Sequence, residues 1–187
     1  MKIIVGLGNP GPEYQKTRHN TGEFYLSQLI KTWPLLSVSQ TNRKVKFILP
    51  KEFMNNSGAG LKKELAKLKL KIKPQDILVI HDDLDIEFGR IKLSFGKSSA
   101  GHKGVESIIK LLKTNKFWRL RVGIAPQKKP LSRAKSREDH KKMVDFILKK
   151  FTPSEEKILN KNFKKISEGL ETWLVHPDKA MLLINSN

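Results

Sequence analysis

Apolar residues along the chain form short continuous runs that alternate with longer stripes of helical spacing. Runs of four to eight residues rich in Val, Ile and Leu are typical of strands in a sheet. The run at residues 89–95 instead alternates apolar and polar positions, as in a half-exposed strand. The expected strands are residues 2–7, 44–49, 76–81, 89–95 and 117–124.

The segments between these runs predict helices, several of which have clear end signals. The stripe in residues 22–33 predicts a helix that ends before Pro34. Ser57 is the expected N-cap of the next helix, and Thr152 with Glu155 around Pro153 predicts a capping box. The other expected helices are residues 104–113, 139–150 and 153–174, and a short one after His176-Pro177.

The order of these elements predicts the fold class. Strands that alternate with helices are typical of an α/β domain. We therefore expect residues 1–187 to form a single domain, with a central twisted sheet that is mixed but mainly parallel and is covered by helices on both faces. Residues 125–139 are expected to form a basic loop. Ligands of such domains bind outside the carboxyl ends of the strands.

Charge is the strongest signal in the composition. Lys and Arg number 37 against 18 Asp and Glu, which gives a net charge of +19. A field of this sign attracts polyanions, and nucleic acid is the first candidate. A lysine-rich proteome that only keeps the protein soluble is the alternative explanation.

The absence of certain residues and segments narrows the function class. There is no cysteine, which excludes a disulfide framework, a thiolate metal site and a cysteine nucleophile. The first apolar run is too short for a signal peptide, and no run reaches membrane-spanning length. We expect a cytoplasmic protein with no membrane partner and no metal or cofactor.

Gly6, Gly8 and Gly11 have the spacing of a dinucleotide-binding loop, but their context does not fit one. That motif needs a helix that begins at the third glycine. Here Pro10 and Pro12 flank Gly11, and the polar residues that follow have no apolar stripe. The glycines therefore predict turns.

Three other motifs fail because a required residue is missing. Ile91 stands where a P-loop needs glycine, Asn55 stands where the serine-hydrolase motif needs its first glycine, and no two histidines have the spacing of a zinc motif.

Polar residues that follow several predicted strands indicate one site. Side chains at the carboxyl ends of neighbouring parallel strands meet at the same edge of the sheet. Taken one at a time, Asn9 and His19 are ordinary loop residues, and only the combination indicates a site. His81 is expected to be structural, and His140 and His176 to be surface residues. The converging residues are Asn9, Tyr14, Arg18, His19, Asn20, Phe53, Asn55, Asn56, Asp82, Asp83, Asp85, His102 and Lys103.

This set permits a limited chemistry. Histidine can act as a general base near neutral pH, and a carboxylate can hold its tautomer. Asparagine amides can donate to a developing oxyanion. Because no protein nucleophile is evident, water activated by His19 and Asp82 is the simplest scheme. That scheme suits hydrolysis of a labile acyl bond such as an ester.

Five stretches of the chain resemble bacterial-type peptidyl-tRNA hydrolase in their sequence and order. They span nearly the whole chain, and the combination is far more specific than a lone glycine motif. The stretches are VGLGNPGPEYQKTRHNTG, FMNNSG, HDDLDIEFGRIKL, GHKGVESI and FWRLRVGI.

The resemblance implies a monomeric enzyme that cleaves the ester between a peptide and the tRNA 3′ end, with tRNA as partner and no metal or cofactor. By motif, His19 is the base that activates water, Asp82 supports it and Asn9 contacts the ester. The remaining matches, which line the cleft or bind tRNA, are Tyr14, Phe53, Asn55 and Arg121.

The chain departs from the family pattern at two places. Lys103 replaces the asparagine of the common GHNG motif, and Ser94 occupies a position that is often lysine. We expect Lys103 to reach a phosphate or sugar of the tRNA 3′ end. The alternatives are a catalytically inactive RNA-binding relative and a hydrolase for a different acyl ester. Retention of His19, Asp82 and Asn9 argues against a pure RNA binder.

Overall fold

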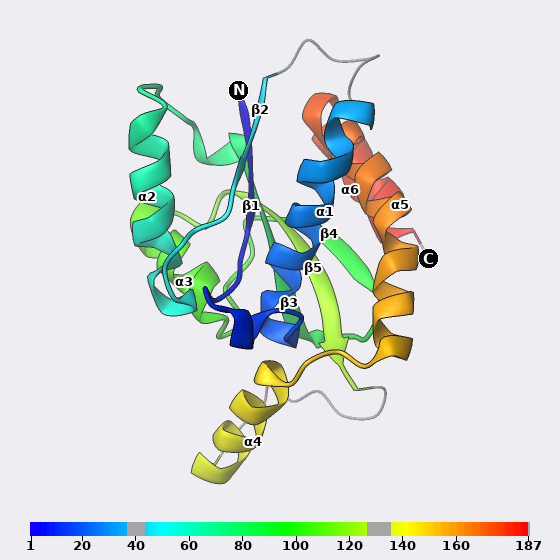
Figure 1. Cartoon of the computed structure of the whole chain (residues 1–187). Coiled ribbons are helices and arrows are strands. Elements are labelled where there is room, and N and C mark those ends of the chain that lie inside the picture. Colours follow the sequence, from blue (N-terminus) through cyan, green and yellow to red (C-terminus); the bar gives the residue numbers. More distant parts are fainter. Residues whose placement is uncertain (37–43, 127–135, 187) are drawn as a thin grey trace.

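A twisted sheet forms the centre of the molecule (Figure 1). The computed structural model describes residues 1–36, 44–126 and 136–186, and within these ranges five strands form one sheet. Three neighbouring pairs in it are parallel, and β4 runs antiparallel to β5. The order across the sheet is β2 (Val45–Ile48), β1 (Lys2–Gly6), β3 (Ile77–Glu87), β5 (Trp118–Ala125) and β4 (Ile91–Phe95).

Helices cover both faces of this sheet. One face packs against α1 (Thr21–Leu36), α5 (Pro153–Val175) and α6 (Pro177–Asn185). The other face packs against α2 (Ser57–Lys67) and α3 (Lys103–Leu112). The remaining helix, α4 (Arg137–Leu148), extends away from the body at the end where β1 finishes (Figure 1). The predicted fold class, a mixed and mainly parallel sheet between helical layers, is confirmed.

The apolar runs explain why the central strands are buried. Successive side chains of a strand point to opposite faces. Ile4 therefore joins the core under α1, whereas Ile3 and Val5 join the core under α2 and α3. In β5, Leu120 lies in the first core and Arg121 points to the opposite face. Residues 3–5 of β1 and 77–80 of β3 are thus apolar on both faces, whereas β5 leaves room for polar chemistry on one face.

Gly22 determines where the first helix meets the sheet. A Cβ atom at this position would lie 2.2 Å from the Ile80 carbonyl oxygen and 2.4 Å from the Leu7 amide nitrogen. Both contacts are to backbone, so only glycine permits this approach. The first turn of α1 thereby lies against β1 and β3, and the 3-10 turn η2 (Arg18–Asn20) is brought beside β3.

The third strand is longer than expected. The sequence predicts that it ends at His81, but β3 continues to Glu87. Asp82 and Asp83 pair with Val122 and Gly123 of β5, so both aspartates lie within the strand and not after it. The apolar run of β3 alone cannot show this, because the extension depends on a partner strand 40 residues away along the chain.

Several predicted helix ends are also wrong. Helix α1 continues through Pro34, whose missing N–H removes one hydrogen bond in the last turn only. Ser57 is not an N-cap, because its hydroxyl donates to the Met54 carbonyl (2.8 Å) and Asn56 precedes the helix. Helix α4 begins at Arg137, with Ser136 as its N-cap.

Other expectations about elements are confirmed or fall outside the described residues. The capping box of α5 forms, with the Thr152 amide donating to Glu155 Oε2 at 2.8 Å. The short helix after His176 is α6. Most of the expected basic loop, residues 127–135, lies outside the described ranges. None of the described helices is long and apolar enough to cross a membrane.

Candidate active site

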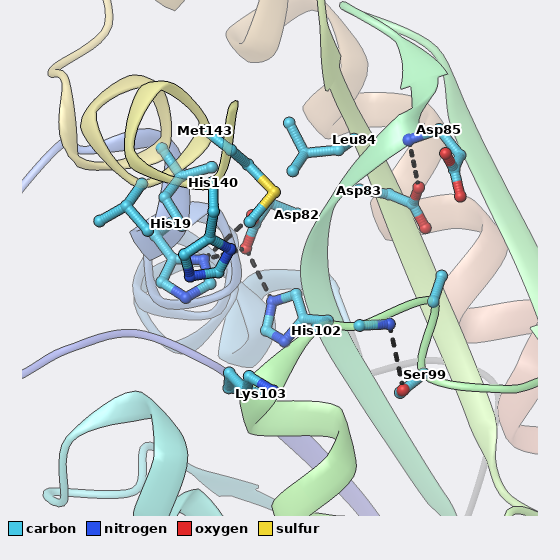
Figure 2. A pocket seen from close by; sticks show the side chains of 14 residues that line it. His19, Asp82, Asp83, Leu84, Asp85, Ser99, His102, Lys103, His140 and Met143 are labelled. Atoms are coloured by element: carbon cyan, nitrogen blue, oxygen red, sulfur yellow. Dashed lines mark hydrogen bonds and ion pairs between the residues drawn. The ribbon is translucent and has the colours of Figure 1, made fainter. Parts of the chain in front are cut away.

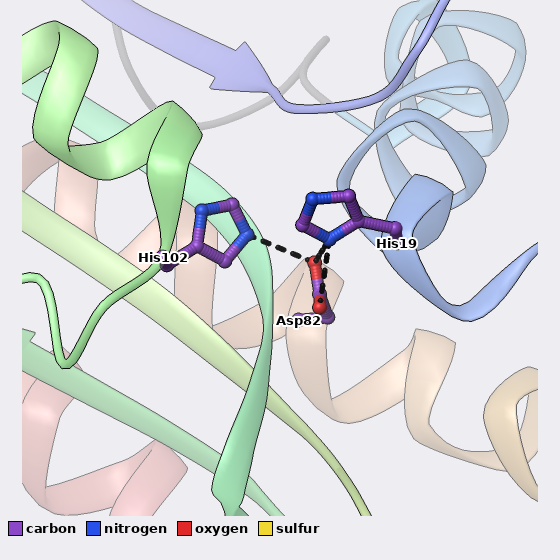
Figure 3. A group of neighbouring side chains, drawn as sticks. All are labelled: His19, Asp82 and His102. Carbon is purple, nitrogen blue, oxygen red and sulfur yellow. Dashed lines mark hydrogen bonds and ion pairs between the residues drawn. The ribbon is translucent and has the colours of Figure 1, made fainter. Parts of the chain in front are cut away.

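Asp82 is the centre of a buried group of three side chains (Figure 3). Its carboxylate, on β3, is 3% exposed. His19, from the turn η2, places Nδ1 3.1 Å from both carboxylate oxygens. His102, the residue before α3, places Nε2 3.0 Å from Oδ1. Asp82 thus holds two imidazoles, one from the turn η2 and one from the start of α3.

The hydrogen bonds define the tautomers of both histidines. Nδ1 of His19 faces only acceptor oxygens of Asp82, so it carries a proton and leaves the lone pair on Nε2. In His102, Nδ1 accepts from the Val105 amide at 3.4 Å, so Nε2 carries the proton that is donated to Asp82. His19 therefore presents a basic nitrogen away from the carboxylate, which is the arrangement of a general base and its orienting acid.

The electrostatics of the pair follow from burial and contact. Burial alone would lower the pKa of His19, but the charge of Asp82 and its hydrogen bond raise the pKa above the ordinary value. Burial alone would raise the pKa of Asp82, but His19 and His102 hold the pKa of this carboxyl well below its usual range. Asp82 is therefore ionised at neutral pH, and the imidazolium form of His19 is stabilised.

His81 lies directly behind this group. Its side chain is 1% exposed, and Nδ1 donates to the Asp82 carbonyl oxygen at 2.6 Å. Its ring packs edge-on against that of His102, with centroids 4.8 Å apart. Burial and the nearby His102 hold the pKa of His81 well below the ordinary value, so it is neutral. It supports the site and does not point into it.

A pocket of about 320 Å³ opens over His19 and Asp82 (Figure 2). Helix α4 forms one wall, with His140 and Met143 beside the two catalytic candidates. Lys103, at the start of α3, lies at the other side. Its ammonium is exposed and 3.2 Å from Glu106 Oε2. Six of the residues expected from sequence to converge therefore share one pocket: His19, Asp82, Asp83, Asp85, His102 and Lys103.

Asn9 lies at a second cavity, of about 450 Å³, next to the first strand. Asn20 holds its backbone from both sides: the Asn9 amide donates to Asn20 Oδ1, and Asn20 Nδ2 donates to the Asn9 carbonyl, each at 2.9 Å. The Asn9 side-chain oxygen accepts from the Met54 amide at 2.8 Å. Within the described residues its Nδ2 has no hydrogen-bond acceptor, so this donor is available to another molecule.

Two aromatic side chains beside the site form a pair on the surface. The rings of Tyr14 and Phe53 meet edge-to-face with centroids 6.1 Å apart. Phe53 is 54% exposed, and Asn55 on the following turn is also exposed. Neither Tyr14, Phe53 nor Asn55 lines the pocket of His19. An exposed aromatic pair can stack on a flat group such as a nucleobase.

Arg121 is held away from the pocket by an ion pair. Its Nε donates to Asp83 Oδ2 at 2.7 Å, and its side chain is 21% exposed. The other Asp83 oxygen accepts from the Asp85 amide at 2.8 Å. Arg121 therefore presents the remainder of its guanidinium at a partly exposed position on β5, next to the pocket but outside it.

The loop before α3 positions His102. The sequence predicted that His102 lies at the site but assigned it no role. Ala100 and Gly101 both have positive φ, 50° and 82°. Arg119 Nη1 donates to the Ser98 carbonyl at 2.6 Å and ties this loop to β5. The GHKG motif was the available signal for His102. The contribution of α4 had a weaker signal, the apolar residues of KMVDFIL.

Residues His19, Asp82 and His102 are also spaced so that they could hold a metal ion. One ligand atom from each lies within 4.8 Å of the others, the only such group in the described parts of the chain. The two ring nitrogens that face Asp82 are already paired with its carboxylate. The arrangement is thus complete as a hydrogen-bonded group, and the expectation of a metal-free site stays a prediction.

Comparison with known proteins gives one family over nearly the whole chain. The family model described as peptidyl-tRNA hydrolase matches residues 3–187. Among curated relatives, the peptidyl-tRNA hydrolase of Aquifex aeolicus is 38% identical over 99% of this chain and 96% of its own. That of Mycoplasma capricolum is 39% identical over 92% of each chain.

Solved structures indicate the same family. The crystal structure of peptidyl-tRNA hydrolase from Acinetobacter baumannii superposes with a TM-score of 0.81 at 28% identity, covering 100% of this chain and 95% of that one. Sequence and fold agree over nearly the full length. The motif residues His19, Asp82 and Asn9 lie on the turn η2, within β3 and after β1. The chain belongs to the peptidyl-tRNA hydrolase family.

Proposed function

We propose that the chain hydrolyses the ester between the peptide and the 3′ end of tRNA in peptidyl-tRNA, with His19 as the general base, and so recycles tRNA from aborted translation. Membership of the family supports the reaction and its substrate. The observation that supports the residue roles is the bidentate contact of His19 with Asp82, 3.1 Å to each oxygen.

The proposed reaction begins with a water molecule beside Nε2 of His19. This nitrogen takes a proton as the water oxygen attacks the ester carbonyl carbon, and the carbonyl oxygen becomes an oxyanion. Collapse of this intermediate breaks the bond to the ribose oxygen, which receives the proton from the imidazolium. The products are a free peptide and tRNA. Asp82 stabilises the imidazolium through both steps.

Asn9 is proposed to donate from Nδ2 to the carbonyl region of the ester. Its backbone and side-chain oxygen are already fixed by Asn20 and Met54, so the amide is oriented before substrate binds. A preoriented donor stabilises developing negative charge without reorganisation. We assign Tyr14, Phe53 and Asn55 to the cleft that holds the peptide and the terminal nucleotide.

We also propose that Lys103 and Arg121 bind the tRNA backbone. Each is exposed on at least one side and carries a positive charge next to the pocket. The net charge of +19 favours this partner. We further propose that the enzyme acts as a monomer in the cytoplasm and needs no metal or cofactor. Full activity in the presence of a chelator tests the last point.

One experiment tests the proposal directly. The protein is incubated with N-acetylated aminoacyl-tRNA and, separately, with free aminoacyl-tRNA, and ester cleavage is followed. We expect cleavage of the N-blocked substrate, and a loss on the order of 10²–10⁴-fold in the His19→Ala variant with binding retained. Binding without cleavage by the unmodified protein would indicate an inactive RNA-binding relative. Near-normal turnover by His19→Ala would remove His19 from the mechanism.

A further inference from the structure

Arg18, the residue before His19, is buried by an unusual set of contacts. Its side chain is 9% exposed. Nη1 donates to the carbonyl oxygens of Lys149 (3.1 Å) and Lys150 (3.0 Å). Nη2 donates to both oxygens of Glu155, at 2.8 and 2.9 Å. A buried arginine with four directed hydrogen bonds holds its partners in one geometry.

Aromatic rings and backbone bonds add to the same junction. The guanidinium carbon of Arg18 lies 4.7 Å from the ring centroid of Phe146 and 5.3 Å from that of Phe151. The Arg18 amide donates to the Lys149 carbonyl at 3.1 Å, and the Phe151 amide donates to the Lys16 carbonyl at 2.9 Å. The chain before His19 is therefore joined to residues 146–155 through both side chain and backbone.

All of these partners belong to the end of α4, the start of α5 and the segment between them. Helix α4 supplies one wall of the pocket, through Met143, Val144 and Ile147 among others. In the described part of the chain α4 packs on η2 more than on any other element. The contacts of Arg18 thus hold together the turn η2, which carries His19, and helix α4, which forms one wall of the pocket.

We propose that Arg18 is a positioning residue that fixes the imidazole of His19 against Asp82 and seats α4 over the pocket. The proposal rests on the role of His19 as the base. The turn η2 has only three residues, so a shift of the Arg18 backbone moves His19 with it. Misplacement of a catalytic group by about 1 Å can cost about 10²-fold in rate.

The contact of His19 with Asp82 is sensitive to such a shift. Both Nδ1 to oxygen distances are 3.1 Å, towards the long end of the hydrogen-bond range. A looser contact weakens the support of the imidazolium by Asp82. Titratable groups on every wall of the pocket face the base, and a test must separate them from His19. They are Asp82, Asp83, Asp85, His102, Lys103 and His140.

The test compares Arg18→Lys with a matched control. Lysine keeps the charge but cannot reproduce the planar fork. The control is Lys16→Ala, which removes an exposed ion pair to Glu156 (3.1 Å) that joins the same two segments. We measure kcat and KM for N-acetylated aminoacyl-tRNA, the thermal midpoint, and the titration of ¹⁵N-labelled histidines by NMR, which follows His19 apart from His102 and His140.

At a temperature where both variants are folded, we expect kcat of Arg18→Lys to fall about 10- to 10²-fold. We also expect the titration of His19 to move to lower pH, because the support of Asp82 is weakened while burial remains. Lys16→Ala should stay within about twofold in kcat. A folded Arg18→Lys protein with a lower thermal midpoint but unchanged kcat and unchanged His19 titration would show a merely structural role and overturn the proposal.

If Arg18→Lys does not fold, the Glu155→Gln variant tests the positioning role instead. This change keeps the shape of the acceptor and removes its charge. A fall in kcat together with a His19 titration that moves to lower pH supports the proposal. An unchanged kcat and an unchanged His19 titration overturn it. His19→Ala in the same assay keeps the two questions apart. Normal turnover by His19→Ala refutes the base assignment, whereas its loss with unaffected Arg18 and Glu155 variants refutes only the positioning role.

Discussion

Replacing Asp82 with asparagine removes the buried charge that supports His19 and changes little else in shape. Asp82 Oδ1 faces donors from both His19 and His102, and Oδ2 faces His19. The asparagine oxygen can keep part of this network, but its NH₂ group would then oppose the His19 Nδ1 proton. The variant therefore loses both the stabilisation of the imidazolium and the fixed tautomer.

The size of the effect follows from the geometry. With charge centres about 4 Å apart and an effective dielectric constant of about 20, the attraction is about 4 kcal/mol. At 1.36 kcal/mol per factor of ten this is about 10³-fold in rate, an upper limit. Because one hydrogen bond can survive, we expect kcat to fall by about 10²- to 10³-fold, with substrate binding retained.

The pH dependence gives the sharper readout. His19 must be neutral to accept a proton, so activity falls as pH drops through its pKa. Burial lowers that pKa, and Asp82 raises it above the ordinary value. Without the carboxylate only burial acts, so the low-pH limb of kcat must move to lower pH. Single-turnover cleavage of N-acetylated aminoacyl-tRNA across pH measures both quantities.

A control and a refuting result complete this test. Asp178→Asn removes one exposed carboxylate from α6, a helix that does not line the pocket, and should leave the rate and the low-pH limb unchanged. Circular dichroism is used to check that the Asp82→Asn variant is folded. A rate within threefold of the unmodified enzyme, or a limb that stays in place or moves to higher pH, would refute the assignment of Asp82.

Three further changes test other parts of the structure. Lys103→Asn should keep activity but weaken binding of full-length substrate and flatten its salt dependence, since among the described residues the exposed ammonium pairs with Glu106 alone. An unchanged salt slope would show that Lys103 does not contribute to binding. Arg121→Ala should reduce the slope of log affinity against log salt by about one, and should also destabilise the fold by leaving Asp83 buried without its partner, as urea unfolding can show. The unmodified protein should lose up to about 1.4 kcal/mol of stability per pH unit below pH 6.5, because only the unfolded His81 takes up a proton there, and His81→Asn should remove this loss. Urea unfolding at pH 5.5 and 7.5 measures it, and an equal loss of stability in the unmodified protein and the variant would contradict the prediction.

Much of the architecture was predictable from local sequence. Apolar runs located the strands at the centre of the described sheet, because a strand buried on both faces needs apolar residues on both. The alternation of apolar and polar positions located β4 at its edge. The capping box at Thr152 and Glu155 was also predictable, since both partners lie within one turn. The end of β3 and the course of α1 past Pro34 were not, because a distant partner strand or the whole helix determines them.

For the site, too, some features were predictable from the sequence and others depended on the folded structure. Residue types and motifs by themselves proposed His19, Asp82 and Asn9 as a base, its carboxylate and an amide donor, because these functions depend on side-chain chemistry, and the three roles stay predictions. Only the tertiary structure decided that His102 shares the Asp82 carboxylate, that Arg121 is bound to Asp83, and that α4 walls the pocket. The first two contacts join residues that lie 20 and 38 positions apart in the chain. The physical reason is that a side chain's chemistry is local, whereas its protonation, tautomer and direction depend on neighbours that only the folded chain brings within hydrogen-bond distance.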